Sequence, residues 1–478
     1  MRRRNKQGPM PDERVIQVRK TVERHVKGCP IRLVRLSDFS FVSREPLLEE
    51  VYERFLDKYA THWVSGDCKS EVSHLASYSI LSHRWMAHEL SMDDVKAIHS
   101  GDYRPTAEKE PAYAKITTFF AKSREYNCFY AWFDSGCIDQ KNNAELTESI
   151  PAMYKWYQNA NVCIVRLAGA VVGSNISDDD WFQRGWTLQE LIAPTHLKIY
   201  DVLWNPVTTD RVGSAKADRF LGIDPISLSR FPPSAGRAPL VISWMVHRRT
   251  TQPEDRAYCI LGLLALYIQM PLERGEAFEK AFFRVQMYAF ACTRERGLLA
   301  WIGTPSVYNS MFASTPESCD FFLQTIDPIS NEDAAICVIQ PSFDVPHLVD
   351  KNTVKMLIYS LLDSSIISPE HSSAIMANIT PSSQTAGIPG NLFLGILGSH
   401  SLKNSENPFN AADWEWNSAG RLPSDMPDVL HYAVLLVGNP SLLDQPFARV
   451  HTHRHIWLNP GWAEGAEPLL AGVKLHLA

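Results

Sequence analysis

The sequence of 478 residues predicts an α/β domain built on a parallel sheet, continued by helices and then by a β-rich region. Three observations lead to this fold class. Short apolar strands alternate with helical segments from residue 78 to residue 200, which is typical of a parallel, right-handed α/β sheet. Residues 162–165 are apolar without a break, as expected of a strand covered on both faces. After residue 300, short β-rich runs are separated by Pro, Ser, Asn and Gly, which favours antiparallel β structure.

The α/β segment is expected to begin after an irregular lead-in that contains one helix. In chain order, we expect helices at 46–59, 113–126, 149–160 and around Glu190, and strands at 78–82, 129–133, 162–165 and 196–200. The helix at 149–160 carries its apolar residues at the 3.6-residue period. A polar insertion at 86–112 separates the first strand from the next helix, and Pro194 ends the Glu190 helix early.

Helices are expected to follow this domain. Thr251-Gln252-Pro253-Glu254 has the pattern of a capping box, which predicts a helix from Asp255 to Met270 and a second one at 277–294. Beyond them, we expect strands at 335–339, 354–361, 392–397, 432–437 and 449–458. The predicted organisation is a basic arm and lead-in at 1–70, an α/β domain at 71–240, a helical extension at 241–300 and a β-rich domain at 301–478.

Composition excludes several classes of protein. The net charge of −6 argues against general nucleic-acid binding. Residues 1–35 carry 11 Lys and Arg against 3 Asp and Glu, a local charge of +8. This basic arm is either a solvated tail, a segment that contacts an acidic surface or a signal for nuclear import. The longest apolar run, 259–270, is too short for a membrane span. Nine cysteines without a C-x-x-C pair favour a reducing compartment, and we expect a cytoplasmic protein.

Four sequence blocks in the α/β segment resemble the fungal heterokaryon incompatibility (HET) domain. The blocks are Tyr78-x-x-Leu81-Ser82-His83-Arg84-Trp85, Trp132-x-Asp134-x-x-Cys137-Ile138-Asp139-Gln140, Ser149-Ile150-x-x-Met153-Tyr154-x-Trp156-Tyr157-x-x-Ala160 and Arg184-Gly185-Trp186-Thr187-Leu188-Gln189-Glu190-Leu191-Ile192-Ala193-Pro194. Arg249-Thr250-Thr251-x-x-Glu254-Asp255-Arg256-Ala257-Tyr258 and Gly275-Glu276 are similar to the family's continuation. The resemblance covers a little under half of the chain.

The resemblance implies both a fold and a function. HET domains trigger cell death when unlike fungal hyphae fuse, so it implies an effector of non-self recognition that acts through self-association or other incompatibility proteins. HET domains are in turn distantly similar to Toll/interleukin receptor (TIR) domains, which implies a flavodoxin-like or TIR-like sheet. Trp186, Glu190 and Leu191 fit the TIR spacing W-C-x-x-E-L, with Thr187 in place of the cysteine. The TIR loop pattern is absent after Asp139, and the insertion at 86–112 has no TIR counterpart.

The TIR glutamate implies that Glu190 is a catalytic carboxylate that cleaves NAD, the expected substrate, at the nicotinamide–ribose bond. In this interpretation Ser82, His83, Arg84 and Trp85 line the same crevice with Asp134 and Trp186. Either Trp85 or Trp132 stacks on a ring there, and Arg84 meets a phosphate. The alternative is a non-enzymatic assembly module, because Thr187-x-x-Glu190 is also a capping box. Catalysis requires Glu190 to face an open crevice near Ser82 and Arg84.

Three further chemistries are weaker alternatives. Cys137 with His83 and Asp139 or Asp134 has the composition of a cysteine-nucleophile site. Asp134 and Asp139 flank one loop, where a metal site competes with ordinary Asx turns. His451, His453 and His455 alternate along one strand and would share a face able to take zinc. We favour structural roles for all three, and therefore expect no metal or resident cofactor.

Overall fold

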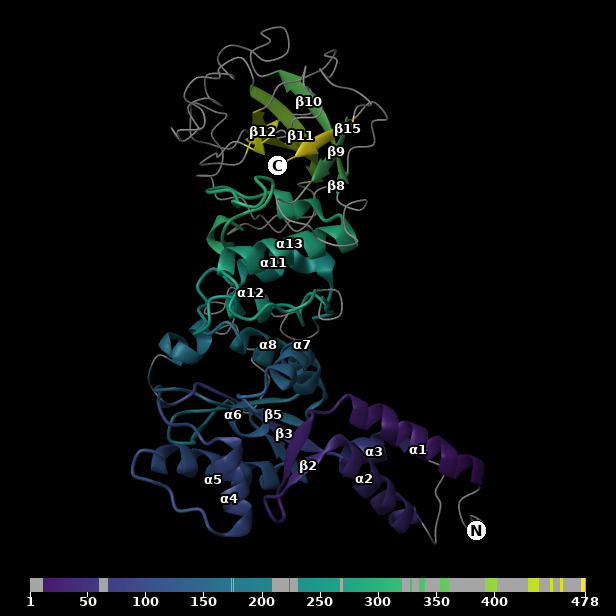
Figure 1. The fold of residues 1–478 in the computed structure, drawn as a ribbon, viewed down its shortest axis with the longest axis vertical. Coiled ribbons are helices and arrows are strands. Elements are labelled where there is room, and N and C mark those ends of the chain that lie inside the picture. Colours follow the sequence, from purple (N-terminus) through teal and green to yellow (C-terminus); the bar gives the residue numbers. More distant parts are fainter. Residues whose placement is uncertain are drawn as a thin grey trace. The chain divides into compact units, whose positions relative to one another are not determined.

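The structure, a computed structural model, describes residues 12–59, 68–172, 174, 176–208, 223, 231–266 and 270–319, together with the strands between residues 327 and 477. The chain forms two compact units, 1–232 and 233–478 (Figure 1). The predicted boundaries at 70, 240 and 300 stay predictions. In the part of the chain that the structure describes, no helix is long and apolar enough to cross a membrane.

The first unit contains a seven-stranded mixed sheet with the order β2-β1-β4-β3-β5-β6-β7. Its strands are β1 (Arg32–Arg35), β2 (Phe41–Ser43), β3 (Tyr78–His83), β4 (Tyr130–Trp132), β5 (Val162–Arg166), β6 (Leu197–Tyr200) and β7 (Pro206–Thr208). The four central strands, β4-β3-β5-β6, pair in parallel, which confirms the predicted parallel core. Their order corresponds to second, first, third and fourth along the chain, as in flavodoxin-like folds.

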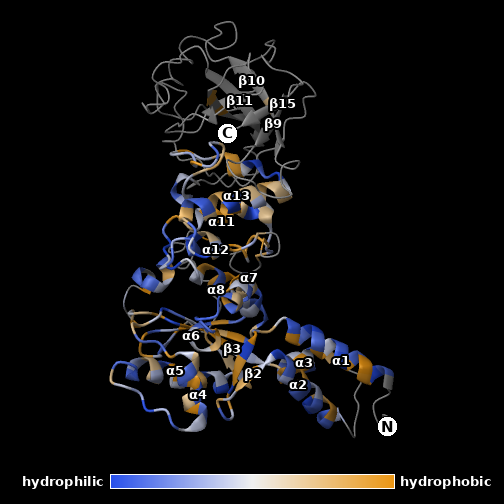
Figure 2. Ribbon diagram, in the orientation of Figure 1, coloured by the Kyte–Doolittle hydropathy of each residue, from blue (hydrophilic) through white to orange (hydrophobic). Residues whose placement is uncertain are grey.

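The edges of the sheet differ from the prediction. β1 pairs antiparallel with β2 and β4, and β7 pairs antiparallel with β6. These strands have only three or four residues, too few to show a sequence period. The helix predicted in the lead-in is confirmed as α2 (Arg44–Tyr59), but the lead-in is not irregular, because it also holds β1 and β2. Two further helices that were not predicted flank it, α1 (Asp12–Lys27) and α3 (Cys68–Leu75). In Figure 2, α1 and α2 show both blue and orange along their length, as amphipathic helices do.

Helices cover both faces of the sheet (Figure 1). They are α4 (Met92–Ser100), α5 (Glu110–Glu125), α6 (Asp134–Cys137), α7 (Asn143–Asn159) and α8 (Thr187–Ile192). The Ser79 hydroxyl of β3 donates to Ser123 of α5, whereas the hydroxyl of Tyr78 donates to the Trp156 carbonyl of α7. Because neighbouring side chains of a strand point to opposite faces, α5 lies on one face and α7 on the other.

The described part of the second unit is helical and then β-rich. Its elements are η3 (Ala235–Arg237), α11 (Ala238–Ser243), α12 (Asp255–Tyr258), α13 (Phe278–Thr293), η4 (Arg296–Leu299), η5 (Pro316–Cys319), β8 (Asp327–Pro328), β9 (Ala335–Ile339), β10 (Thr353–Ser360), β11 (Leu392–Ser401), β12 (Val429–Val437), β13 (Ala448–Arg449), β14 (Ile456–Leu458) and β15 (Lys474–Leu477). The strands form a mainly antiparallel sheet, with β15 parallel to β9.

The predicted helix from Asp255 to Met270 is wrong beyond its first turn. Residues 259–265 form turns, and Ala265 has a positive φ of 54° that a continuing helix does not allow. Nor does a capping box form. Glu254 is the N-cap residue without a side-chain cap hydrogen bond, and its carboxylate accepts from the Gly275 amide at 2.9 Å. The second predicted helix is confirmed as α13.

The later family-like blocks meet in this unit as an ionic network. Arg284 of α13 pairs with Glu276 at 2.7 Å, and both side chains are 4% exposed. Glu276 also accepts from the Tyr258 hydroxyl, and Arg274 pairs with Asp255. We assign these blocks a structural role, because their charged groups bond to one another inside the unit.

Candidate active site

The carboxyl ends of β3 and β5 form the point where the parallel sheet reverses its strand order. From β3 the chain crosses to β4 on one side, and the next crossover leads to β5 on the other side. Ligands of open α/β sheets bind in the crevice at such a point. Ser82 and His83 end β3, and the loop after β5 begins at Leu167.

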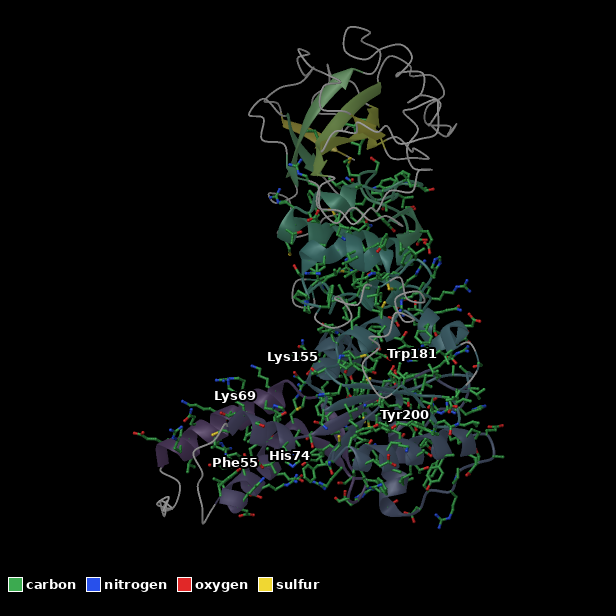
Figure 3. The ribbon with its side chains drawn as sticks, turned by 180° about the vertical axis from the view of Figure 1, so that it is seen from behind. Phe55, Lys69, His74, Lys155, Trp181 and Tyr200 are labelled. Atoms are coloured by element: carbon green, nitrogen blue, oxygen red, sulfur yellow. The ribbon has the colours of Figure 1, made fainter. Side chains whose placement is uncertain are left out.

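Glu190 lies at this edge and is tied to β3. The Ser82 hydroxyl donates to the Glu190 carboxylate, and the Trp181 indole N–H donates to the same hydroxyl oxygen at 2.8 Å. Ser82 and Trp181 are completely buried, and Glu190 is 7% exposed. Figure 3 labels Trp181 among the side chains that pack at the sheet. The expected contact between Glu190 and Ser82 is present, but the carboxylate is enclosed rather than open.

Burial gives Glu190 an unusual proton affinity. It raises the pKa of Glu190 to about 7, because removing the carboxylate from water disfavours its charged form. The hydrogen bond from Ser82 opposes this rise, the charge of Asp134 adds to it, and Arg184 and Tyr157 oppose it. A carboxyl group with this pKa changes its charge near neutral pH, which is a property of catalytic groups more often than of structural ones.

The capping-box alternative for Glu190 does not form. The helix α8 begins at Thr187, and its N-cap residue, Trp186, makes no side-chain cap hydrogen bond. The Thr187 hydroxyl donates instead to the backbone carbonyls of Trp181, at 2.6 Å, and Arg184, at 2.8 Å. The carboxylate of Glu190 reaches across to β3 rather than folding back on its own helix.

His83 does not join Ser82, because it points to the opposite face of β3. There its Nε2 lies 3.6 Å from the Glu89 carboxylate and 4.0 Å from Asp134, too far for a hydrogen bond. The ammonium group of Lys115, on α5, pairs with Glu89, and its side chain is 0% exposed. Burial lowers the pKa of His83, and the charge of Lys115 lowers it further.

Neither Glu89 nor Lys115 was among the site residues predicted from the sequence. Burial alone would raise the pKa of Glu89, but the interactions of its carboxylate with the nearby His83 ring and with the Lys115 ammonium group outweigh it and lower the pKa to about 2. Lys115 stands beside Ile116 and four residues before Phe119, both buried on α5. A cation beside the apolar stripe of a helix was the one signal available in the sequence. Glu89 lies in the polar insertion at 86–112, where no sequence pattern marked it as a site residue.

The other predicted site residues occupy the rim of the sheet edge. Arg84 forms an ion pair with Asp180, in which both side chains are about half exposed. The Trp85 indole N–H donates to the Asp134 carboxylate at 2.7 Å, and Trp85 is 40% exposed. Trp186 is half-buried at the start of α8. The structure therefore brings Ser82 to Glu190, Arg84 to Asp180 and Trp85 to Asp134.

The cysteine and metal alternatives find little support. Cys137 is 1% exposed, and burial raises the pKa of its thiol to about 12, which disfavours the reactive thiolate. Asp139 accepts from the Lys141 amide at 3.0 Å in an Asx turn. Among the described residues, no group of three His, Cys, Asp or Glu side chains is placed to hold a metal ion. His451, His453 and His455 lie outside the described residues.

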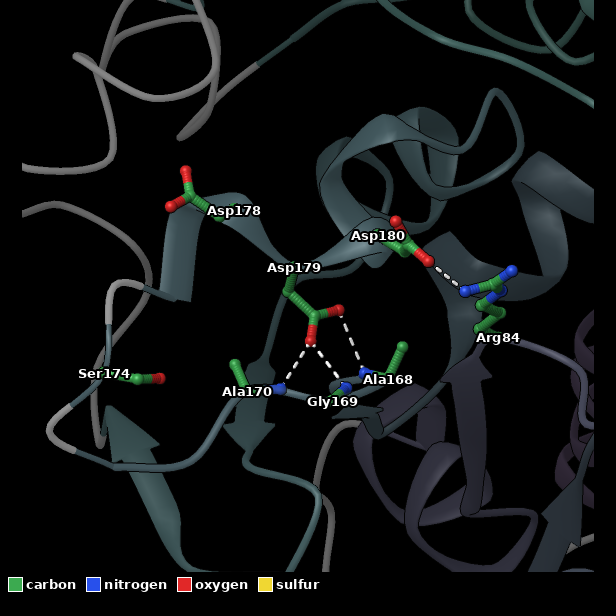
Figure 4. Close-up of a pocket in the computed structure, with 8 residues that line it drawn as sticks. All are labelled: Arg84, Ala168, Gly169, Ala170, Ser174, Asp178, Asp179 and Asp180. Atoms are coloured by element: carbon green, nitrogen blue, oxygen red, sulfur yellow. Dashed lines mark hydrogen bonds and ion pairs between the residues drawn. The ribbon is translucent and has the colours of Figure 1, made fainter.

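A pocket of about 320 Å³ opens beside Arg84, between the loop after β5 and the acidic segment at 178–180 (Figure 4). Its lining residues are Arg84, Ala168, Gly169, Ala170, Ser174, Asp178, Asp179 and Asp180. The Asp179 carboxylate accepts hydrogen bonds from the backbone amides of Ala168, Gly169 and Ala170 at 2.8–2.9 Å. Burial alone would raise the pKa of Asp179, but these bonds and a fourth from Trp181 hold it below its usual range.

The comparisons with known proteins agree with the first three sequence blocks. Residues 78–176 match the family described as heterokaryon incompatibility protein (HET). A segment of 227 residues, 44% of this chain, is 33% identical to the vegetative incompatibility protein HET-E-1 of Podospora anserina, of which it covers only 16%. No solved structure matches the chain. The residues from β3 to the loop after β5 thus carry a heterokaryon incompatibility (HET) domain.

Proposed function

We propose that this protein is a cytoplasmic effector of fungal non-self recognition, and that its α/β domain causes cell death by cleaving NAD through Glu190. The match of residues 78–176 to the HET family supports the role in incompatibility. The observation that supports catalysis is the buried Glu190 carboxylate at the reversal point of the sheet, with a pKa raised to about 7. Perturbed carboxylates at the ligand-binding edge of a fold are candidates for chemistry.

The reaction needs few groups. Water adds to C1 of the nicotinamide ribose while the C1–N bond breaks, and its electron pair returns to the pyridinium ring. The products are nicotinamide, ADP-ribose and one proton, which passes to water. Because nicotinamide leaves as a neutral ring, no general acid is required. The ionised Glu190 carboxylate stabilises the oxocarbenium-like transition state, an electrostatic contribution of about 3 kcal/mol or more.

The rim supplies groups for the rest of the dinucleotide. The face of Trp85, at 40% exposure, is accessible to an aromatic ring. Arg84 carries the guanidinium that meets a phosphate once Asp180 is displaced. Since Glu190 is only 7% exposed, substrate entry requires the groups around it to move. We propose that self-association or another incompatibility protein drives that movement.

The enclosure of Glu190 also favours a second function, a signalling module that acts by assembly alone. Here the Ser82–Glu190 bond only ties α8 to β3. Four of the six exposed large hydrophobic side chains among the described residues, Trp85, Val171, Val172 and Leu203, follow β3, β5 and β6 at the same edge of the sheet. Exposed apolar groups gathered on one edge are typical of an interaction surface.

Nicotinamide release from NAD separates the two functions. Concentrated full-length protein is incubated with NAD, and Glu190→Gln is compared with wild type and with Glu125→Gln, whose carboxylate lies on the surface of α5. Glutamine keeps the hydrogen bond from Ser82, so the fold is retained while the charge is lost. We expect release by wild type and Glu125→Gln, and a loss of about 100-fold or more in Glu190→Gln. If no variant releases nicotinamide while all still kill host cells, the assembly function holds and catalysis is wrong.

A further inference from the structure

The loop after β5 presents successive backbone amides to one anion. Ala168 donates to one oxygen of the Asp179 carboxylate at 2.9 Å, and Gly169 and Ala170 donate to the other at 2.8 Å (Figure 4). Consecutive amides that converge in this way form a nest, a concavity that binds phosphates in many proteins. In this structure the occupant of the nest is a carboxylate of the chain itself.

A cation stands next to the nest. Arg84 lines the same pocket of about 320 Å³, and its guanidinium pairs with Asp180, the neighbour of Asp179. Both members of the pair are about half exposed, so separating them has a small free-energy cost. Amides and a guanidinium around one pocket are the donors that a phosphate group prefers. Two adjacent carboxylates now occupy these donors.

The next residue connects the nest to Glu190. The backbone amide of Trp181 donates to Asp179 at 2.9 Å, and its indole N–H donates to Ser82 at 2.8 Å. Ser82 in turn donates to Glu190. Trp181 is completely buried in the 3-10 turn η2, Asp180–Gln183. Asp179 therefore anchors the turn that encloses the carboxylate proposed to be catalytic.

We propose that the amide nest at 168–170 and Arg84 form a phosphate site that Asp179 and Asp180 block in the resting protein. A phosphate oxyanion, in the proposed function that of the dinucleotide, replaces both carboxylates. Release of Asp179 frees η2 to move, withdraws Trp181 from Ser82 and opens the way to Glu190. The inference rests on the proposed function for the identity of the ligand, but the site itself is tested without NAD.

The local charge explains why the resting site is closed. Asp178, Asp179 and Asp180 place three carboxylates along one wall of the pocket. Their charge opposes an incoming anion, so wild type binds inorganic pyrophosphate weakly. Removing Asp179 empties the nest as well as removing one charge. Removing Asp178 takes one charge from the same wall and leaves the three hydrogen bonds from the nest amides to Asp179 in place.

Calorimetric titration of the full-length protein with inorganic pyrophosphate tests the site. We expect Asp179→Ala to bind about tenfold or more tightly than wild type, the factor that corresponds to about 1.4 kcal/mol of relieved competition. The matched control Asp178→Ala gains about twofold or less, because a single exposed charge contributes little. Adding Arg84→Gln to Asp179→Ala abolishes the gain. Equal gains in Asp178→Ala and Asp179→Ala, or no gain in either, would overturn the proposal.

The coupling between Asp179 and the accessibility of Glu190 is tested by a separate measurement. Labelling of carboxyl groups by a water-soluble carbodiimide with glycine ethyl ester, read by mass spectrometry, is expected to modify Glu190 about tenfold faster in Asp179→Ala than in Asp178→Ala. Equal rates contradict the coupling. If Asp179→Ala does not fold, as judged by its melting curve, Asp180→Asn replaces it. That variant frees Arg84 and is expected to bind pyrophosphate about threefold more tightly than wild type, a gain that Arg84→Gln removes; without that gain the proposal is wrong.

The proposed phosphate site and the proposed NAD cleavage can be refuted independently of each other. Pyrophosphate binding in Asp179→Ala without any nicotinamide release would leave the site standing and refute the proposed reaction. Nicotinamide release that depends on Glu190, without any gain of pyrophosphate binding, would leave the reaction standing and refute the blocked site.

Discussion

Two buried glutamates near the end of β3 differ in one respect that sets their chemistry. Glu190, on the Ser82 face, is hydrogen-bonded to a neutral hydroxyl and has a pKa raised to about 7. Glu89, on the His83 face, is paired with Lys115 and has a pKa lowered to about 2. Burial acts in the same direction on both carboxylates. The presence or absence of a buried cation decides which of them stays ionised.

The difference in pKa gives the two glutamates at the end of β3 different roles. The two carboxyl groups have pKa values about 5 units apart, and such divergence between neighbouring groups is typical of sites with distinct acid–base assignments. Glu89 is ionised at all ordinary pH values, so it serves to hold Lys115 and α5 against the sheet. Glu190 is poised to gain or lose its charge near neutrality, which makes it the candidate for chemistry.

Removing the cation from the His83 face has the largest expected effect. Lys115→Met keeps the shape of the side chain but leaves the Glu89 carboxylate buried without its ammonium partner. We expect the free energy of unfolding to fall by about 3–5 kcal/mol, measured by urea denaturation. Lys109→Met, which breaks a more exposed pair with Asp94, is the control and should cost about 1 kcal/mol or less. Equal small losses would mean that Lys115 does not compensate Glu89.

Removing the charge from the Ser82 face has an effect that depends on pH. The pKa of Glu190 is higher in the folded protein than its ordinary value of 4.5, so the folded state binds the extra proton. Wild type therefore loses stability as the pH rises from about 4.5 to about 7. Glu190→Gln escapes this loss, and we expect it to match wild type near pH 4.5 and to exceed it by about 3 kcal/mol at pH 8. A difference that does not change between these pH values would contradict the raised pKa.

Removing the hydroxyl that faces Glu190 has a smaller effect. Ser82→Ala deletes the donor to the carboxylate and the acceptor of the Trp181 indole N–H. We expect a loss of about 1–2 kcal/mol in unfolding free energy at pH 8, where Glu190 is ionised in wild type. The pKa of Glu190 rises further, since the Ser82 bond lowers it. Ser79→Ala, which faces α5 instead, controls for the loss of a buried hydroxyl and leaves the Glu190 titration unchanged.

The smallest effect on stability is expected at the rim. Trp85→Phe keeps an aromatic face but removes the hydrogen bond from the indole to Asp134. Because this bond is exposed, we expect a loss of about 0.5 kcal/mol or less, measured by the melting temperature. If Trp85 stacks on the substrate, Trp85→Phe keeps most NAD cleavage and Trp85→Ala loses it. Identical activities of the two variants would remove Trp85 from the site.

The sequence predicted the centre of the sheet better than its margins. The four parallel strands are short segments rich in apolar residues that alternate with helical segments, and this local pattern is visible in the sequence. β1, β2 and β7 are short and depend on distant partners, such as Val34 opposite Ala131, so no local pattern identifies them. The turns after Tyr258 were mistaken for helix because the run is apolar on all sides, and the positive φ of Ala265 is a tertiary effect.

The candidate site, like the sheet, was predicted only in part. The alternation of side chains along a strand separates Ser82 from His83, yet all four residues from Ser82 to Trp85 were expected in one crevice. Glu89 and Lys115 are separated by 26 residues and meet only through the fold. The spacing of Trp186, Glu190 and Leu191 identified the right carboxylate. It did not reveal that Ser82 and Trp181 would enclose it.

The proton affinity of Glu190 is the central claim, and it is measured most directly by nuclear magnetic resonance titration of protein labelled with ¹³C at the glutamate carboxyl carbons. The signal absent from Glu190→Gln identifies this residue. We predict a midpoint of about 7 for Glu190, while Glu89 stays ionised at every pH at which the protein is folded. A Glu190 midpoint near 4.5, its ordinary value, would contradict the role assigned to burial and remove the main reason to regard this carboxylate as catalytic.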